Sequence, residues 1–222
     1  MSTRIVYQEE LKKLNQDVLD MGSGIEQAID KTNQAVLTLD KDLAIQLIKE
    51  DDLFDQMEHA IEKYCIDLVI KQAPLASDWR RIASIMRIVS DLERIADHCS
   101  DISTYVLKLI EKPPITPPEY FDEMFAVMKS MVKDTIEAFV HLDVSAVPGI
   151  VERDDIVDAF FEKNVQDISE NMRKEPESIE SYVSYLFINK YIERMSDHSV
   201  NVARWLPYIA SGEYFTSREE HG

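Results

Sequence analysis

The sequence predicts an all-α protein made of two tandem antiparallel three-helix bundles that are related by a pseudo-twofold repeat. Apolar residues recur at alternating steps of three and four, the pattern of packed helices. The 222 residues include only 5 glycines and 8 prolines, which leaves few turns. Segments of the first half return about 100 residues later, a period too long for a solenoid and typical of a duplicated domain.

The first repeat is expected to contain three helices. The first has an apolar seam, and Gly22 and Gly24 interrupt it, which indicates either a kink or a close backbone contact. The second is expected over about 41–71, and the third from a cap at Ser77 or Asp78 to about 110. The seam residues of the first helix are Leu11, Leu14, Val18, Met21, Ile25, Ala28, Thr32 and Ala35.

The second repeat is expected to match the first, with helices over about 121–138 and 144–173 and a third that follows Pro176 and ends near Gly212. Residues 113–118 hold four prolines and predict a short, stiff connector. The predicted organisation is a first repeat at 1–112, the connector at 113–118, a second repeat at 119–212 and a frayed tail at 213–222.

The charge balance excludes some functions. With 42 acidic and 24 basic residues the formal net charge is −18, which argues against duplex nucleic acid and against an anionic membrane surface as direct ligands. No apolar run approaches 18 residues, and the N-terminus lacks the apolar core of a signal peptide, so a cytoplasmic protein is expected. Cys65 and Cys99 are expected to be reduced core residues.

Paired carboxylates are the most informative motif. Leu92–His98 returns as Ile192–His198, and each copy places a Glu and an Asp at i and i+4 on one helix face. Like charges at this spacing repel, so their recurrence predicts a bound cation. Asp-rich segments of the two second helices border the same seams. The candidate metal ligands are Glu93, Asp97, Asp101, Glu193, Asp197, Asn201, Asp51, Asp55, Asp154 and Asp158.

Oxygen-rich sites of this kind suit Mg²⁺, Ca²⁺, Mn²⁺ and iron. Arg94 and Arg194 lie about 100° around the helix from each Glu and are not expected to neutralise the acids. His98 and His198 are either ligands, partners of ligands or structural residues.

The alternative to metal binding is a solvated acidic face that duplication has preserved. No residue has the pattern of an activated nucleophile, so no catalytic residue is assigned. Three functions stay open: a regulatory adaptor with metal-bearing clusters, a metal-dependent phosphohydrolase and a metal-free helical scaffold.

The two Glu-Arg-x-x-Asp-His copies, together with the Asp-rich second helices, resemble the PhoU family over about residues 5–212. The resemblance implies a non-enzymatic cytoplasmic regulator of phosphate uptake that also restrains phosphate-starvation signalling. Its implied partners are the ATPase side of the phosphate ABC transporter and a sensor histidine kinase, and it would be peripheral to the membrane only through them.

The resemblance further implies divalent or trivalent metal ions, iron clusters among them, at the Glu/Asp-x-x-x-Asp motifs. Asn201 stands where Asp101 stands in the first repeat, so the second site has one fewer charge and is expected to hold metal less tightly. The sequence leaves monomer and homodimer open.

Overall fold

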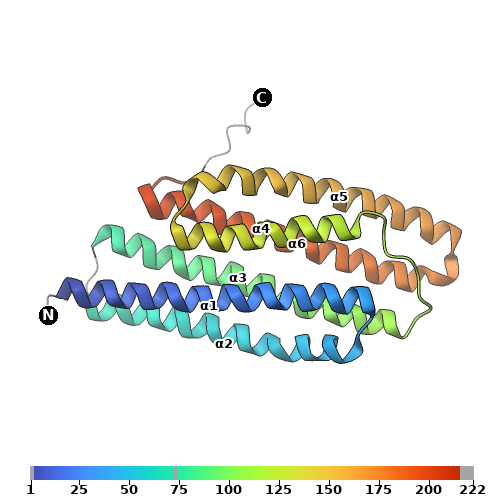
Figure 1. Cartoon of the computed structure of the whole chain (residues 1–222), viewed down its shortest axis with the longest axis horizontal. Coiled ribbons are helices and arrows are strands. Elements are labelled where there is room, and N and C mark those ends of the chain that lie inside the picture. The colour runs from blue at the N-terminus through green and yellow to red at the C-terminus, as the bar shows by residue number, and fades with distance from the viewer. Residues whose placement is uncertain (1–2, 73–74, 216–222) are drawn as a thin grey trace.

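The structure is a computed structural model that describes residues 3–72 and 75–215, and it confirms the all-α prediction (Figure 1). The first bundle contains three helices and the second bundle another three, with two 3₁₀ turns, η1 (Val144–Ala146) and η2 (Pro176–Ser178), ahead of the last two. The helices are α1 (Thr3–Thr38), α2 (Lys41–Gln72), α3 (Ala76–Ile110), α4 (Phe121–His141), α5 (Val147–Lys174) and α6 (Ile179–Ser211).

The two bundles lie side by side along their length (Figure 1). Equivalent helices meet across the boundary: α3 packs along α6, and α1 contacts α4. Within the described residues these are the two helix pairs that join the bundles. Contacts between equivalent elements are what a pseudo-twofold axis produces, so the predicted relation between the halves is confirmed.

The seam of α1 is buried as predicted. Leu14, Met21 and Ile25 are 0% exposed, and they belong to one apolar core that runs through both bundles. Burial of each such side chain contributes roughly 1.5–3 kcal/mol. The core therefore fixes which faces of α2, α3, α5 and α6 remain available for polar groups.

Gly22 and Gly24 mark close contacts, since α1 continues as a helix through both. A Cβ added at Gly22 would lie 2.9 Å from Cγ2 of Ile136 on α4, and one at Gly24 would lie 3.1 Å from Cε1 of Phe54 on α2. Of the two readings that the sequence left open, the close contact is the one that the structure supports.

The helix ends differ from expectation at one point. The prediction that Ser77 or Asp78 caps α3 is wrong, because the helix begins at Ala76 and its cap is Leu75, whose carbonyl accepts the Trp79 N–H at 2.9 Å. The end of α6 is as predicted, with Gly212 at φ 86° donating its N–H to Tyr208 O.

Residues 113–118 contain no helix, as their prolines predict. The domain boundaries at 112, 118 and 212 stay predictions, and most of the predicted frayed tail lies outside the described residues. Cys65 and Cys99 are buried and unbridged. Across 3–72 and 75–215, none of the helices combines the length and apolar character of a membrane span.

Candidate metal centre

The first carboxylate cluster lies between α2 and α3, which pack along each other. Burial raises the pKa of Asp51 to about 6, and the nearby charges of Asp97, Asp55 and Asp101 add to this rise. Charges affect a pKa in this way only at short range, so carboxylates of both helices lie near one another, as the sequence predicted. Burial and neighbouring negative charge both disfavour the ionised acids, so a cation among them is stabilising.

Glu93 is the most buried member, with 7% of the residue exposed. Burial raises its pKa, Arg94 lowers it, and the charge of Glu58 and a hydrogen bond with Asp55 raise it further. Glu58 was absent from the sequence-based candidates. Its spacing could have revealed it, because Asp51, Asp55 and Glu58 follow the i, i+4, i+7 pattern of one helix face.

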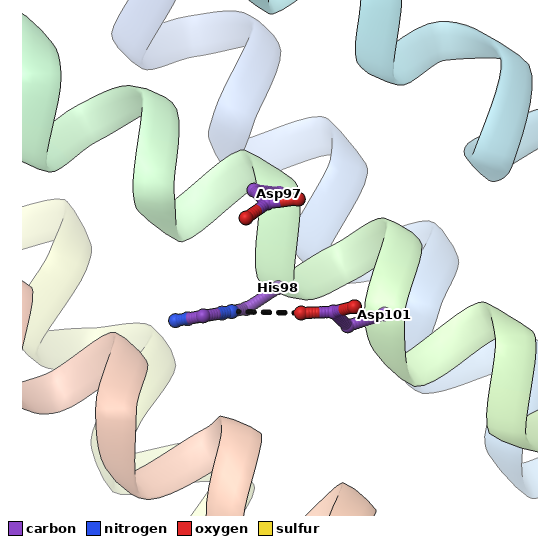
Figure 2. Close-up of side chains that lie close together, drawn as sticks. All are labelled: Asp97, His98 and Asp101. Atoms are coloured by element: carbon purple, nitrogen blue, oxygen red, sulfur yellow. Dashed lines mark hydrogen bonds and ion pairs between the residues drawn. The ribbon is translucent and has the colours of Figure 1, made fainter.

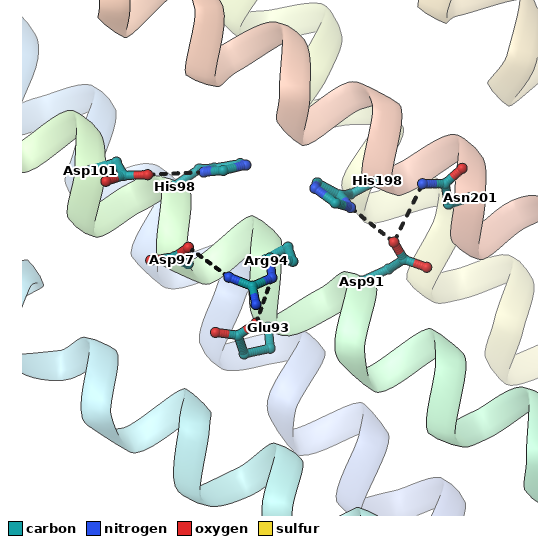
Figure 3. A network of polar contacts seen from close by, with 8 residues as sticks. All are labelled: Asp91, Glu93, Arg94, Asp97, His98, Asp101, His198 and Asn201. Carbon is teal, nitrogen blue, oxygen red and sulfur yellow. Dashed lines mark hydrogen bonds and ion pairs between the residues drawn. The ribbon is translucent and has the colours of Figure 1, made fainter.

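Arg94 contacts two acids of the first cluster, which its backbone position did not indicate. Its Nε lies 3.4 Å from Glu93 Oε2 and its Nη1 lies 3.2 Å from Asp97 Oδ2 (Figure 3). The long side chain folds back over the acidic face, which an angle measured at the backbone does not capture. The side chain of Arg94 is 55% exposed, so water screens this pairing and leaves the cluster acidic.

His98 joins this cluster from the interior side of α3. One donor atom each of Asp97, His98 and Asp101 lies within 4.8 Å of the others, and His98 Nδ1 is 3.2 Å from Asp101 Oδ2 (Figure 2). The ring is buried, and its Nε2 has no hydrogen-bond partner within the part of the chain that the structure describes. His198 lies across the interface, 5.6 Å away between ring centroids.

The second cluster lies between α5 and α6. Burial is the largest cause that raises the pKa of Asp154, of Asp158 and of Asp197, and the charges of the neighbouring acids, Glu193 among them, add to it. Ser196 Oγ donates to Asp154 Oδ1 at 2.7 Å, and Lys190 pairs with Glu193 at 2.5 Å. Asp158 and Asp197 are exposed, so this cluster is the more open of the two.

Asn201 lies apart from the second cluster. Its Nδ2 lies 3.4 Å from Asp91 Oδ1 on α3, and the same oxygen is 2.9 Å from His198 Nδ1 (Figure 3). The structure therefore brings together nine of the ten predicted ligands in two groups and directs Asn201 to the interface between the bundles. Asp91 was not among the candidates, since no repeat of its position signals it.

The donor sets fit hard or borderline cations. The first cluster offers five of the predicted carboxylates, and His98 Nε2 is a buried nitrogen without a partner among the described residues. The second offers four carboxylates with a serine and a lysine among them. Carboxylate-rich sites with imidazole suit Mn²⁺ and iron, and purely carboxylate sites suit Mg²⁺ or Ca²⁺ as well.

Fold and site together define a class: all-α proteins of two repeated three-helix bundles, each with a carboxylate cluster between its second and third helices. A family model for the PhoU domain matches residues 18–106 and 121–206, one match in each bundle. The chain belongs to the PhoU family.

Relatives and solved structures agree with this assignment. The chain is 31% identical to the phosphate-specific transport system accessory protein PhoU homolog of Clostridium acetobutylicum, covering 95% of this chain and 97% of that protein. It is 32% identical to the Aquifex aeolicus homolog, covering 92% and 93%.

The crystal structure of PhoU from Streptococcus pneumoniae matches with a TM-score of 0.88 at 31% identity, covering 95% of this chain and all of that one. PhoU from Pseudomonas aeruginosa matches with a TM-score of 0.87 at 27% identity, over 93% of this chain and 100% of that one.

Proposed function

We propose that this chain is a cytoplasmic accessory protein of a phosphate-specific transport system. The observation that carries the proposal is the end-to-end match to relatives that are named as such accessory proteins. The chain acts by protein contacts, on the ATPase side of the phosphate ABC transporter and on a sensor histidine kinase whose output it holds low when phosphate is plentiful. It reaches the membrane only through these partners.

Deletion of the gene tests the regulatory role. In a strain without the chain, a phosphate-starvation promoter is expected to stay active at high phosphate, and the full-length chain is expected to restore repression. Tagged full-length chain is expected to retain the transporter ATPase on an affinity column. Normal repression in the deletion strain contradicts the regulatory role.

We further propose that the two carboxylate clusters hold divalent or trivalent cations, with iron among the candidates. Asp51, Asp55, Glu93, Asp97 and Asp101 would hold the first group, and the pair of acids on each of α5 and α6 would hold the second. When bound, the cation neutralises the acidic faces and stiffens the contact between paired helices. Partner affinity then changes only as far as the metal-loaded and metal-free states differ in their contacts.

Elemental analysis of the purified chain tests the metal sites. Glu93→Gln and Glu193→Gln are each expected to lower the metal content, and Glu93→Gln to lower it more because its cluster is more acidic. Glu152→Gln removes an exposed charge on α5 outside both clusters and is expected to leave the metal content unchanged. Full metal content in the double variant contradicts the assignment of these ligands.

The same preparations test the non-enzymatic character of the chain. We expect no turnover of a generic phosphoester by the metal-loaded protein, because the proposal assigns it no nucleophile or general base. Turnover that Glu93→Gln abolishes would favour a metal-dependent phosphohydrolase instead. Equal partner affinity with and without chelator would contradict the proposed coupling between metal and partner.

A further inference from the structure

A hollow of about 460 Å³ lies between α3, the C-terminal part of α6 and the segment that follows α6. Arg87 of α3 and Arg204 of α6 both line it, so two arginines from different helices border one space. Trp205 and Tyr214 form an aromatic wall, with ring centroids 5.8 Å apart. The hollow lies outside both carboxylate clusters.

The charge pattern of the hollow differs from that of the whole molecule. The chain carries a net charge of −18, yet two of its arginines line this one space. Among the described residues, neither guanidinium lies within 4.0 Å of a carboxylate oxygen. Their hydrogen-bond donors are therefore available to a ligand.

Asp91 is the acidic residue that lines the hollow, and one of its oxygens contacts α6 and neither arginine. Its Oδ1 lies 2.9 Å from His198 Nδ1 and 3.4 Å from Asn201 Nδ2, so the carboxylate is directed to α6 (Figure 3). Arg204 also lies near Asp154 of the second carboxylate cluster. Its charge lowers the pKa of Asp154, and burial raises that pKa more strongly. A substitution of Arg87 therefore tests ligand binding in the hollow without altering the second carboxylate cluster.

We propose that this hollow binds a phosphate group, either as inorganic phosphate or as the phosphate of a small ester. Guanidinium groups match phosphate oxygens with paired hydrogen bonds, and two of them on separate helices favour a dianion over a monovalent ion. The aromatic wall can pack against the organic part of an ester. This inference goes beyond the regulatory role proposed above and does not depend on it.

Titration of the purified full-length chain tests the inference. Trp79→Phe leaves Trp205 as the one tryptophan of the two in the sequence, so its fluorescence reports on the hollow. Inorganic phosphate is added to metal-free protein at constant ionic strength, and calorimetry repeats the measurement. Saturable binding is expected by both methods, with sulfate weaker because it carries no proton to donate. No saturation by either method overturns the proposal.

Matched variants locate the binding. Arg87→Gln and Arg204→Gln are each expected to weaken phosphate binding about tenfold or more, since each removes charge-assisted hydrogen bonds. Arg173→Gln makes the same charge change at an exposed position on α5 away from the hollow, and it is expected to bind as the unaltered chain does. Equal weakening by Arg173→Gln, or unchanged binding by both hollow variants, overturns the proposal.

Calorimetry with Trp205→Ala separates the two sources of the phosphate group. Weaker binding of a nucleoside monophosphate with unchanged binding of inorganic phosphate assigns the hollow to an ester. Equal effects on both ligands assign it to free phosphate. All of these measurements use the isolated chain, so a negative result does not contradict the proposed transport role. Failure of the deletion test, in turn, does not contradict phosphate binding in the hollow.

Discussion

Asp51 and Glu93 are carboxylic acids in surroundings that disfavour their charge. Burial raises the pKa of each, and the acids on the facing helix add to the effect. Arg94 offsets part of this charge from the solvent side. Each ionised acid therefore costs stability in the metal-free chain and contributes affinity when a cation binds, so one residue has opposite effects in the two states.

Asp51→Asn is expected to stabilise the metal-free chain at pH 7. The pKa of Asp51 rises from 3.8 to about 6, so the native state binds this proton more tightly than the unfolded chain does. Its contribution to stability is fully present below pH 3.8 and is lost as the pH rises through about 6. Allowing for solvent screening, the variant should gain about 1 kcal/mol at pH 7.

Urea unfolding in chelator, at pH 7 and again below pH 4, measures this gain. Asp52→Asn alters the exposed neighbouring acid and is expected to change stability by less than about 0.5 kcal/mol. With saturating metal the sign should reverse, since the unaltered chain gains a ligand that the variant lacks. A destabilised variant in chelator at pH 7 contradicts this account of Asp51.

At this scale the sequence predicted which carboxylates lie close together and missed what depends on side-chain direction. Periodicity alone places Asp51, Asp97 and their counterparts on facing helix surfaces. It does not show that Arg94 folds back over Glu93, because that contact depends on the rotamers of a long side chain. It also cannot show that Asn201 turns to Asp91, because the two residues meet only when the bundles pack.

The helices approach one another closely where side chains are small or absent. Gly22 lets α1 approach α4 across the boundary between the bundles, because a Cβ there would meet Ile136. The sequence predicted helix extents well, since long seams with few breakers fix where each helix runs. It misplaced the α3 cap, because both Ser77 and Leu75 are compatible with a helix start and the backbone of Leu75 decides.

Gly22→Ala is expected to destabilise the chain by about 1–2 kcal/mol. Alanine favours the helix by up to about 1 kcal/mol, but crowding against Ile136 costs about 1–3 kcal/mol. Gly149→Ala is the matched control, because a Cβ at Gly149 meets nothing within 4 Å. This control should be neutral or stabilising in urea unfolding. Equal effects of the two substitutions would contradict the close contact.

A buried polar pair distinguishes the second bundle from the first. Asn164 Nδ2 donates to Asn189 Oδ1 at 2.9 Å, and Asn164 Oδ1 accepts the Tyr120 N–H at 2.9 Å, which ties the residue just before α4 to α5. Both asparagines are 0% exposed. The first repeat has Ile61 at the position that corresponds to Asn164, 103 residues earlier, and Val89 at the position that corresponds to Asn189, 100 residues earlier. Both of these apolar residues are buried as well.

Asn164→Ile is expected to cost about 2–4 kcal/mol, because it leaves the Tyr120 N–H and the Asn189 side-chain oxygen without the partners that Asn164 provides. The double variant Asn164→Ile with Asn189→Val restores the residue types of the first repeat. It should cost less than the sum of the two single changes by about 1 kcal/mol, since it leaves fewer buried groups unpaired. Urea unfolding of the three variants measures this coupling, and additive costs contradict it.

The whole molecule carries a net charge of −18, and its acidic clusters lie on both bundles. The all-α class and the duplication could be predicted because they depend on patterns that span the entire chain. The packing of α3 along α6 could not, because no local pattern specifies which face of a bundle meets the other. Self-repulsion of this size makes the stability of the molecule depend on its ions.

The melting temperature of the metal-free chain is therefore expected to rise with NaCl, which screens the repulsion. At fixed ionic strength, Mn²⁺ at about one hundred times its dissociation constant should add about 2.7 kcal/mol per site. This corresponds to roughly 5–10 °C for a chain of this size. Differential scanning calorimetry measures both effects, and Glu93→Gln should reduce only the second. A melting temperature that changes with neither NaCl nor Mn²⁺ contradicts this prediction.

The pairing of α3 with α6 also bears on the relation between the two repeats. A single repeat on its own would leave uncovered the helix faces that meet across the boundary between the bundles, and a second copy of the same repeat is what covers them in this chain. Because both copies belong to one chain, the two halves of this boundary need not be identical in sequence. Two examples of such a difference are Asn201 at the position that corresponds to Asp101, and Asn164 at the position that corresponds to Ile61.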